Sequence, residues 1–213
     1  MILSRGRRYL FIHIPKTGGT SMALALEARA KKDDIMLGDT PKARNRRRRV
    51  KDVRSSGRLW KHSRLTDLYG LAEEEEIESF FIFTLVRNPW DRLVSYYHWL
   101  KEQRFEHPAV DLARALSFSE FLNHDHTKAS IRGMPYGLYV TNRHGVERCN
   151  AFVRLEHLDD DLAPVARHLG FVPEMPHVNR SERGAYREAY SAKDRDLVAE
   201  ICAVDIARFA YQF

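Results

Sequence analysis

The chain has 213 residues, of which 44% are hydrophobic and 30% are charged. These values are typical of a single folded domain with one core, and they exclude collagen-like and disordered classes of protein. The formal net charge of +6 favours anionic partners, but it does not separate nucleic acid from nucleotide or acidic glycan. Much of the charge lies between Lys42 and Arg58, where four arginines stand in a row at 46–49.

The cysteine count and the apolar runs bear on the cellular location of the protein. Two cysteines, Cys149 and Cys202, are too few for a disulfide framework, so we expect partly buried thiols and a cytoplasmic location. The longest early apolar run, Tyr9 to Ile14, is shorter than the ~20 residues that a membrane span needs. Pro15 interrupts this run before it could serve as an export signal. We therefore predict no membrane span and no export signal, and the oligomeric state stays unknown.

The first part of the chain predicts a strand, a turn and a helix. Tyr9 to Ile14 is a short β-rich apolar run, which indicates a strand buried on both faces. Pro15 and two glycines end it, and Met22 to Ala30 is rich in strong helix formers. Residues 31–58 show no clear period and contain the basic run, so we expect a basic loop or excursion there.

A second junction of strand and helix follows. Phe80 to Val86 predicts a strand, and Asn88 is a good N-cap for a helix from Pro89 to about Arg104. The later elements are predicted as a short helix at Phe118–Asn123, a loop at Gly133–Gly145, a strand at Asn150–Leu155, and helices at Asp159–Leu169 and Lys193–Phe209. The alternation favours an α/β fold with a mostly parallel central sheet flanked by helices, as one domain over residues 1–213.

The first junction has the composition of an anion site. Residues 15–21 read Pro-Lys-Thr-Gly-Gly-Thr-Ser, and they place backbone NH groups and a helix N-terminus at one point. Glycines allow close approach, hydroxyls add donors, and Lys16 adds a full charge. Lys16 precedes the glycines, unlike the lysine of GxxxxGK[ST], and GxGxxG is absent. The loop alone therefore leaves two alternatives, an anion site and a structural turn.

Two stretches resemble motifs of the PAPS-dependent carbohydrate sulfotransferases, a family that includes the heparan sulfate 2-O-sulfotransferases and bacterial relatives. Residues 14–21 are similar to the family's 5′-phosphosulfate loop, and residues 86–97 are similar to its 3′-phosphate motif. The similarity continues through 152–158, 176–181 and 205–213. The resemblance implies a P-loop-like three-layer sandwich, PAPS (3′-phosphoadenosine 5′-phosphosulfate) as the donor, PAP as the product, and a hydroxyl acceptor on a glycan or glycoconjugate.

The resemblance also implies roles for individual residues. It assigns the donor's 5′ end to Lys16, Thr17, Gly18, Gly19, Thr20 and Ser21, the 3′-phosphate to Arg87 and Ser95, and a closing loop to Asn179, Arg180 and Ser181. We expect Lys16 to neutralise charge on the bridging oxygen as the sulfuryl group leaves. Arg92 could instead form an ion pair with Asp91 or Glu156. We expect no metal, because in-line transfer depends on positioning and charge, and no His/Cys ligand spacing is present.

The acceptor hydroxyl needs a base, and histidine is the usual residue for that task. His62 is the candidate, since it stands between the two motifs, where the family tends to place its catalytic histidine. Some family members use a carboxylate, which keeps that alternative open. His13 is expected to be buried or next to the cofactor, and the other eight histidines have surface interpretations at least as good.

Two other functions remain as alternatives. An ATP-dependent kinase or nucleotidase with an unusual loop would need an acidic residue for Mg²⁺ after a strand, but Val86 is followed by Arg87. A nucleic-acid module would depend on the arginines at 46–49, but no basic motif with interleaved aromatic residues supports it, and we expect no nucleic-acid partner. The basic run could also hold an anionic glycan or be merely solvated.

Overall fold

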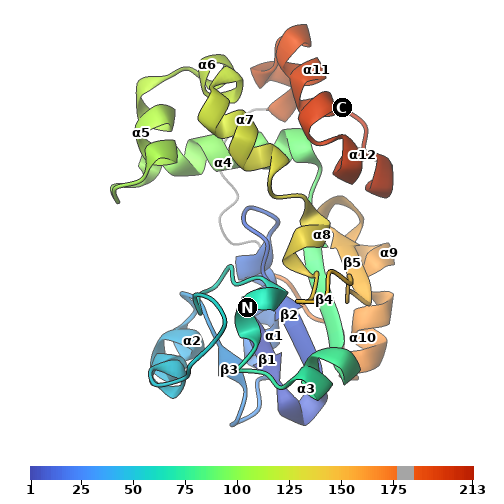
Figure 1. Ribbon diagram of the computed structural model, residues 1–213. Coiled ribbons are helices and arrows are strands. Elements are labelled where there is room, and N and C mark those ends of the chain that lie inside the picture. Colours follow the sequence, from blue (N-terminus) through green and yellow to red (C-terminus); the bar gives the residue numbers. More distant parts are fainter. Residues whose placement is uncertain (177–184) are drawn as a thin grey trace. The chain divides into compact units, whose positions relative to one another are not determined.

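The computed structural model describes residues 1–176 and 185–213, and the chain divides into two compact units (Figure 1). Of the described residues, 1–86 and 136–176 form the first unit, and 87–135 and 185–213 form the second. The expectation of a single domain stays a prediction.

The first unit contains a five-stranded sheet with the order β3-β1-β2-β4-β5. Its strands are β1 (Ile2–Ser4), β2 (Tyr9–Ile12), β3 (Ile35–Met36), β4 (Phe81–Val86) and β5 (Ala151–Arg154). β2, β4 and β5 are parallel, and β1 is antiparallel to both β2 and β3. Within this sheet β1 alone runs against the others, which confirms the predicted mostly parallel sheet. Ile12 pairs with Thr84, so β2 and β4 end at the same edge.

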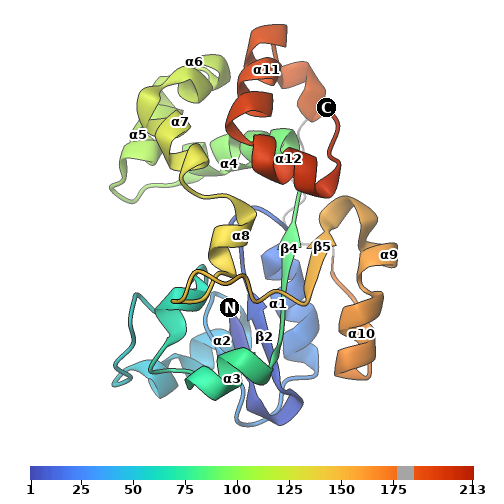
Figure 2. The same ribbon diagram turned by 45° about the vertical axis from the view of Figure 1, so that its right-hand side comes forward.

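Helices flank this sheet, as the alternation of segments predicts. Figure 2 shows α1 (Gly19–Ala28) and α10 (Ala163–Leu169) on one side of the strands, and α3 (Glu74–Ser79) and α8 (Tyr136–Tyr139) on the other. All four residues of β2 are buried, so both of its faces are covered. Tyr9 and Phe11 join one apolar cluster with Met22 and Leu26 of α1, which holds this helix and the loop before it against the sheet.

Regular structure also occurs where the sequence predicted a basic loop. Residues 31–58 contain β3, the helix α2 (Pro41–Arg46) and a 3₁₀ turn at Arg47–Val50. Arg46 Nη1 donates to the carbonyl oxygen of Asp34 at 3.1 Å, and Arg49 Nη1 donates to the same oxygen at 3.1 Å. These two arginines therefore hold α2 and the turn after it against the end of β3, and hydropathy periodicity gives no sign of such contacts.

Short elements account for the other differences from the predicted pattern in this unit. β1 was missed because three residues give no readable period. The predicted helix at Asp159–Leu169 is two helices, α9 (Leu158–Asp161) and α10, and the predicted loop at Gly133–Gly145 contains α8. Short 3₁₀ turns lie at Arg5–Arg7, Leu65–Leu68 and Leu155–His157.

The second unit is helical. It contains α4 (Pro89–Glu102), α5 (Pro108–Ala115), α6 (Phe118–Asn123), α7 (Asp125–Arg132), α11 (Ala192–Ile201), α12 (Ala203–Phe209) and a 3₁₀ turn at Tyr186–Ala189. Asn88 caps α4 as predicted, because its side chain accepts a hydrogen bond from the Trp90 amide at 3.1 Å. The predicted helix at Lys193–Phe209 is interrupted at Cys202. Neither α5 nor α7 is expected from the sequence, because both have only eight residues and α7 is largely polar.

Candidate active site

The loop between β2 and α1 has an unusual backbone. Lys16 has a φ of 67° and Gly18 has a φ of 84°, so both residues adopt the left-handed conformation. This conformation costs a residue with a side chain ~1 kcal/mol, and such residues cluster at functional sites. The cost at Lys16 fits a loop whose conformation is set by function rather than by turn propensity.

Packing explains the two glycines of this loop. A Cβ atom on Gly18 would lie 2.8 Å from Leu155 Cδ1, and a Cβ atom on Gly19 would overlap the imidazole of His13. The chain therefore passes so close to its neighbours that only glycine fits at both positions. Since α1 begins at Gly19, the His13 ring lies directly beside the first turn of this helix.

The three hydroxyl residues of the loop have different surroundings. Thr17 is fully buried, and its hydroxyl donates to the carbonyl oxygen of Ile14 at 2.9 Å. Its predicted contact with the donor would therefore use the backbone NH, because the hydroxyl already stabilises the loop. Ser21 is also buried, whereas Thr20 is half-buried and lines a pocket.

His62 lies next to this loop through its contact with His13. Its Nδ1 lies 2.8 Å from the backbone carbonyl oxygen of His13, and the two ring centroids are 4.5 Å apart. A carbonyl oxygen can only accept, so Nδ1 carries the hydrogen, and in the neutral ring Nε2 is the basic atom. The Trp60 ring contacts the His62 ring edge-on, with 5.0 Å between the ring centroids. The buried Ser63 hydroxyl forms hydrogen bonds with the backbone NH and carbonyl of Trp60, which stabilises this turn.

His13 matches the expectation of a buried histidine. Burial lowers the pKa of its imidazole well below the usual value, and nearby positive charges, including those of Lys61 and Lys16, act in the same direction. His13 is therefore neutral near pH 7. Seven other histidines are exposed, as expected, and they are His98, His107, His124, His126, His144, His157 and His168.

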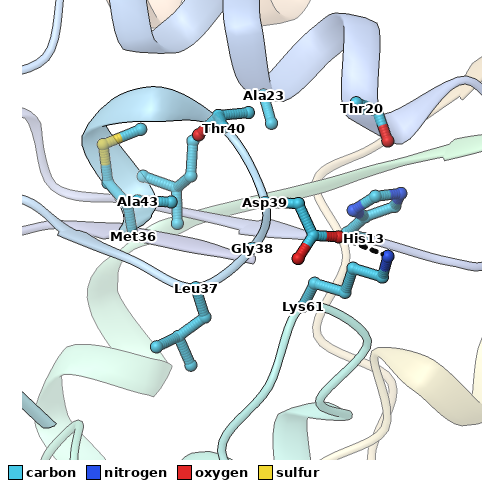
Figure 3. A pocket seen from close by; sticks show the side chains of 11 residues that line it. His13, Thr20, Ala23, Met36, Leu37, Gly38, Asp39, Thr40, Ala43 and Lys61 are labelled. Atoms are coloured by element: carbon cyan, nitrogen blue, oxygen red, sulfur yellow. Dashed lines mark hydrogen bonds and ion pairs between the residues drawn. The ribbon is translucent and has the colours of Figure 1, made fainter. Parts of the chain in front are cut away.

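A small pocket lies beside the loop between β2 and α1 and is lined by His13, Thr20, Met36, Asp39, Thr40 and Lys61, among others (Figure 3). Lys61 Nζ donates to Asp39 Oδ2 at 2.6 Å, as the dashed line marks. This hydrogen bond from Lys61 lowers the pKa of the Asp39 carboxyl. This pair is not predictable from the sequence, because its members are 22 residues apart and neither belongs to a motif.

In the second unit, Arg87 forms an ion pair that the sequence analysis did not predict. It is the residue after β4, and its Nε and Nη2 lie 2.8 and 2.6 Å from Asp91 Oδ2. Arg87, Asp91 and Ser95 follow one another at four-residue spacing, so they share one side at the start of α4. The i,i+4 spacing of Arg87 and Asp91 is the sequence signal for this pair, whereas the sequence analysis above considers Asp91 as a partner of Arg92.

The aromatic residues around this motif serve the core. The Trp90 indole donates to the carbonyl oxygen of Arg195 at 3.0 Å, and its ring contacts Phe213 edge-on. The Tyr97 hydroxyl donates to the carbonyl oxygen of Leu116 at 2.7 Å. Both side chains are buried, so these two residues contribute to packing.

Three predicted donor ligands, Asn179, Arg180 and Ser181, lie outside the described residues. Residues 1–176 and 185–213 contain no group of three or more His, Cys, Asp or Glu side chains suited to a metal ion. Over the same ranges, none of the helices combines the length and the apolar character needed to cross a bilayer. Cys149 and Cys202 form no disulfide, and both thiols are half-buried, as predicted.

Comparison with known proteins gives a family. The model of the sulfotransferase family matches residues 1–212. Among solved structures, the chain is similar to mouse sulfotransferase SULT7A1 complexed with PAP, at 14% identity and a TM-score of 0.47, over 93% of this chain and 82% of that one. No match is found among curated proteins. The family match confirms the predicted enzyme class and, with it, the donor PAPS that the resemblance implied: the chain belongs to the sulfotransferase family.

Proposed function

We propose that this sulfotransferase transfers the sulfuryl group of PAPS to a saccharide hydroxyl, with His62 as the base and Lys16 at the leaving oxygen. The observation that favours this assignment most is the contact chain from the donor loop to a histidine. The His13 ring packs on Gly19, and the His13 carbonyl oxygen accepts from His62 Nδ1. A base adjacent to the donor loop is what in-line transfer to a hydroxyl requires.

The donor would be held at both ends. We propose that the NH groups at the start of α1, with Lys16, Thr20 and Ser21, bind the 5′-phosphosulfate, because a helix N-terminus favours an anion. Arg87 and Ser95 are proposed for the 3′-phosphate. Asp91 would hold the Arg87 guanidinium in one orientation, which favours a directed contact with phosphate. Asn179, Arg180 and Ser181 are proposed to contact the donor as well, from the closing loop that the resemblance implies.

Calorimetry tests the donor assignment. PAP should bind much more tightly than AMP, because AMP lacks the 3′-phosphate, and Arg87→Ala should remove most of that difference. The matched control is Arg132→Ala, which removes an exposed arginine that pairs with Glu200 elsewhere in the same unit. Equal affinities for PAP and AMP in the unaltered protein would contradict the assignment of Arg87.

The role of His62 is tested by separating rate from binding. In the proposed mechanism Nε2 takes the proton from the acceptor hydroxyl while Nδ1 stays bonded to the His13 carbonyl oxygen. His62→Asn should lower kcat by ~10²-fold or more, since general bases contribute that much, and should leave PAP affinity nearly unchanged. His144→Asn, at an exposed histidine that bonds Glu74, is the control. An unchanged kcat in His62→Asn would favour a carboxylate as the base.

The acceptor class rests on the family resemblance, and a screen of glycans with PAPS labelled in its sulfuryl group tests it. A saccharide that takes up the label would support the proposal, and transfer to other hydroxyl compounds alone would contradict it. The cytoplasmic location remains part of the proposal. The alternative of an ATP-dependent kinase or nucleotidase has no support from the family match.

A further inference from the structure

Trp60 is an exposed tryptophan next to the proposed base. It is 40% exposed, although tryptophan is usually buried over most of its surface. Its ring contacts the His62 ring, with 5.0 Å between the centroids, and its indole NH has no hydrogen-bond partner among the described residues. One exposed apolar side chain needs no explanation by itself. An exposed ring with an unpaired donor beside a base is, however, a surface suited to an acceptor.

The turn that carries Trp60 is held by its backbone. The fully buried Ser63 hydroxyl lies 2.9 Å from the carbonyl oxygens of both Arg58 and Trp60, and it accepts from the Trp60 amide at 2.9 Å. None of these bonds involves the side chain of Arg58 or Trp60. The turn therefore presents both side chains in fixed places, and replacement of either should leave the turn intact.

Arg58 adds a positive charge to this surface. Its guanidinium lies over the Trp60 ring, 5.0 Å from the ring centroid, which is a cation–π contact. The side chain is exposed, and it forms no ion pair with any residue that the structure describes. The NH groups of a guanidinium in this position remain available to an anion. Trp60 and Arg58 together thus offer apolar surface, an NH donor and a charge beside His62.

The structure divides the basic run into arginines with different surroundings. Arg46 and Arg49 bond to backbone carbonyl oxygens, so they serve the fold. Arg47 and Arg48 are exposed and form no ion pair or ring contact within the described part of the chain. Arg58 is exposed as well, but it contacts a ring that in turn contacts the proposed base. The arginine best placed for the acceptor therefore lies outside the row at 46–49.

We propose that Trp60 and Arg58 bind the acceptor and give the enzyme a preference for acidic over neutral saccharides. The exposed part of the indole contacts the C–H groups on the face of a sugar ring, and its NH donates to a hydroxyl of that sugar. Arg58 binds an anionic substituent of the saccharide, a carboxylate or a sulfate. This inference deepens the proposed function and rests on it, because it requires His62 to be at the acceptor.

Acceptor kinetics test the preference with three forms of glucuronate-containing tetrasaccharides of several linkages. The forms are the acid, the same chain with its carboxylates reduced to alcohols, and the reduced chain with one sulfate ester. At least one anionic form should have a kcat/KM about tenfold above that of the reduced chain, mainly through KM, which is the value of one hydrogen bond to a charged group. Equal values for all three forms, or transfer to neutral saccharides only, would overturn the inference and leave the proposed function standing.

Variants separate this site from the general charge of the basic run. Arg58→Ala should raise KM for the anionic forms by about tenfold and for the reduced chain by less than twofold. Arg48→Ala, the matched control, removes one exposed arginine and should change each KM by less than twofold. Trp60→Leu keeps an apolar side chain beside His62 and should raise KM for all three forms by about tenfold, with kcat changed less. Equal effects of Arg58→Ala and Arg48→Ala would show unspecific attraction and overturn the inference.

Tryptophan fluorescence gives a measurement that needs no catalysis. Trp60 is exposed, whereas Trp90 is buried and Trp99 is half-buried. With PAP bound, the acidic tetrasaccharide should change the emission, and Trp60→Leu should abolish that change. PAP affinity in calorimetry should be the same in all variants, and a loss in Arg58→Ala or Trp60→Leu would overturn the inference. Binding of the tetrasaccharide without transfer of label would support this surface but contradict the proposed function.

Discussion

A single methyl group at Gly19 should disturb the site through His13. A Cβ atom there would come closer than 3.0 Å to the His13 ring, which is buried and cannot turn into solvent. The φ of Gly19 lies outside the left-handed region, so alanine meets no backbone strain and the whole effect comes from this overlap. Overpacking of this kind costs ~1–3 kcal/mol. Because the His13 carbonyl oxygen orients His62, displacement should also lower kcat.

A double-mutant cycle with urea denaturation measures this effect. Gly19→Ala alone should lower the free energy of unfolding by ~1–3 kcal/mol. In a His13→Ala background the overlap is gone, and the same change should be neutral or stabilising, because alanine is a better helix former than glycine. Thr20→Ala adds no atom one residue further along and serves as the control. If Gly19→Ala costs the same with and without the His13 ring, the reasoning is refuted.

Three further predictions concern charge. The folded state holds His13 neutral, while His13 in the unfolded chain takes up a proton near pH 6.5. The free energy of unfolding should therefore fall by up to ~1.4 kcal/mol per pH unit below that pH. In urea denaturation at several pH values, His13→Gln should show a smaller fall of this free energy with pH. Arg87→Lys keeps the charge but loses the guanidinium geometry, so calorimetry should show PAP binding weaker by tenfold or more and AMP binding unchanged. Equal losses of affinity for PAP and for AMP would contradict this prediction. Arg154 bonds Asp161 and lowers the pKa of that carboxyl, so Asp161→Asn should cost ~1–3 kcal/mol near pH 7 in urea denaturation. That difference should shrink as the pH falls below 3.8, and a difference that persists there would exclude the ion pair as its source.

The main strands and the helices that follow them could be predicted from the sequence, because they combine apolar runs with local capping signals. Phe81–Val86 followed by Asn88 and Pro89 is the clearest case. Elements stabilised by distant contacts could not be predicted in this way. The helix α2 depends on arginines that bond the backbone of Asp34, and periodicity contains no information about such contacts.

The candidate site also combines residues that motifs predict with contacts that depend on distant parts of the chain. Lys16, the two glycines and His62 could be chosen from motifs, because the chemistry needs those residue types in that order. The contact of His13 with His62 depends on a turn 49 residues away, and the pair of Lys61 with Asp39 joins residues 22 positions apart. Motifs thus give the residues proposed for the donor, while the contacts that orient His62 become known only from the structure.

Transfer from PAPS by the purified chain tests the central claim most directly. PAPS labelled in its sulfuryl group is mixed with a glycan acceptor, and PAP release and label in the glycan are followed together in single-turnover reactions of the unaltered protein and of Lys16→Met. We predict equal amounts of PAP and labelled glycan, and a rate ~10²-fold lower in Lys16→Met, the loss expected when a group of ~3 kcal/mol at the leaving oxygen is removed. PAP released without label in an acceptor, or an unchanged rate in Lys16→Met, would contradict the account.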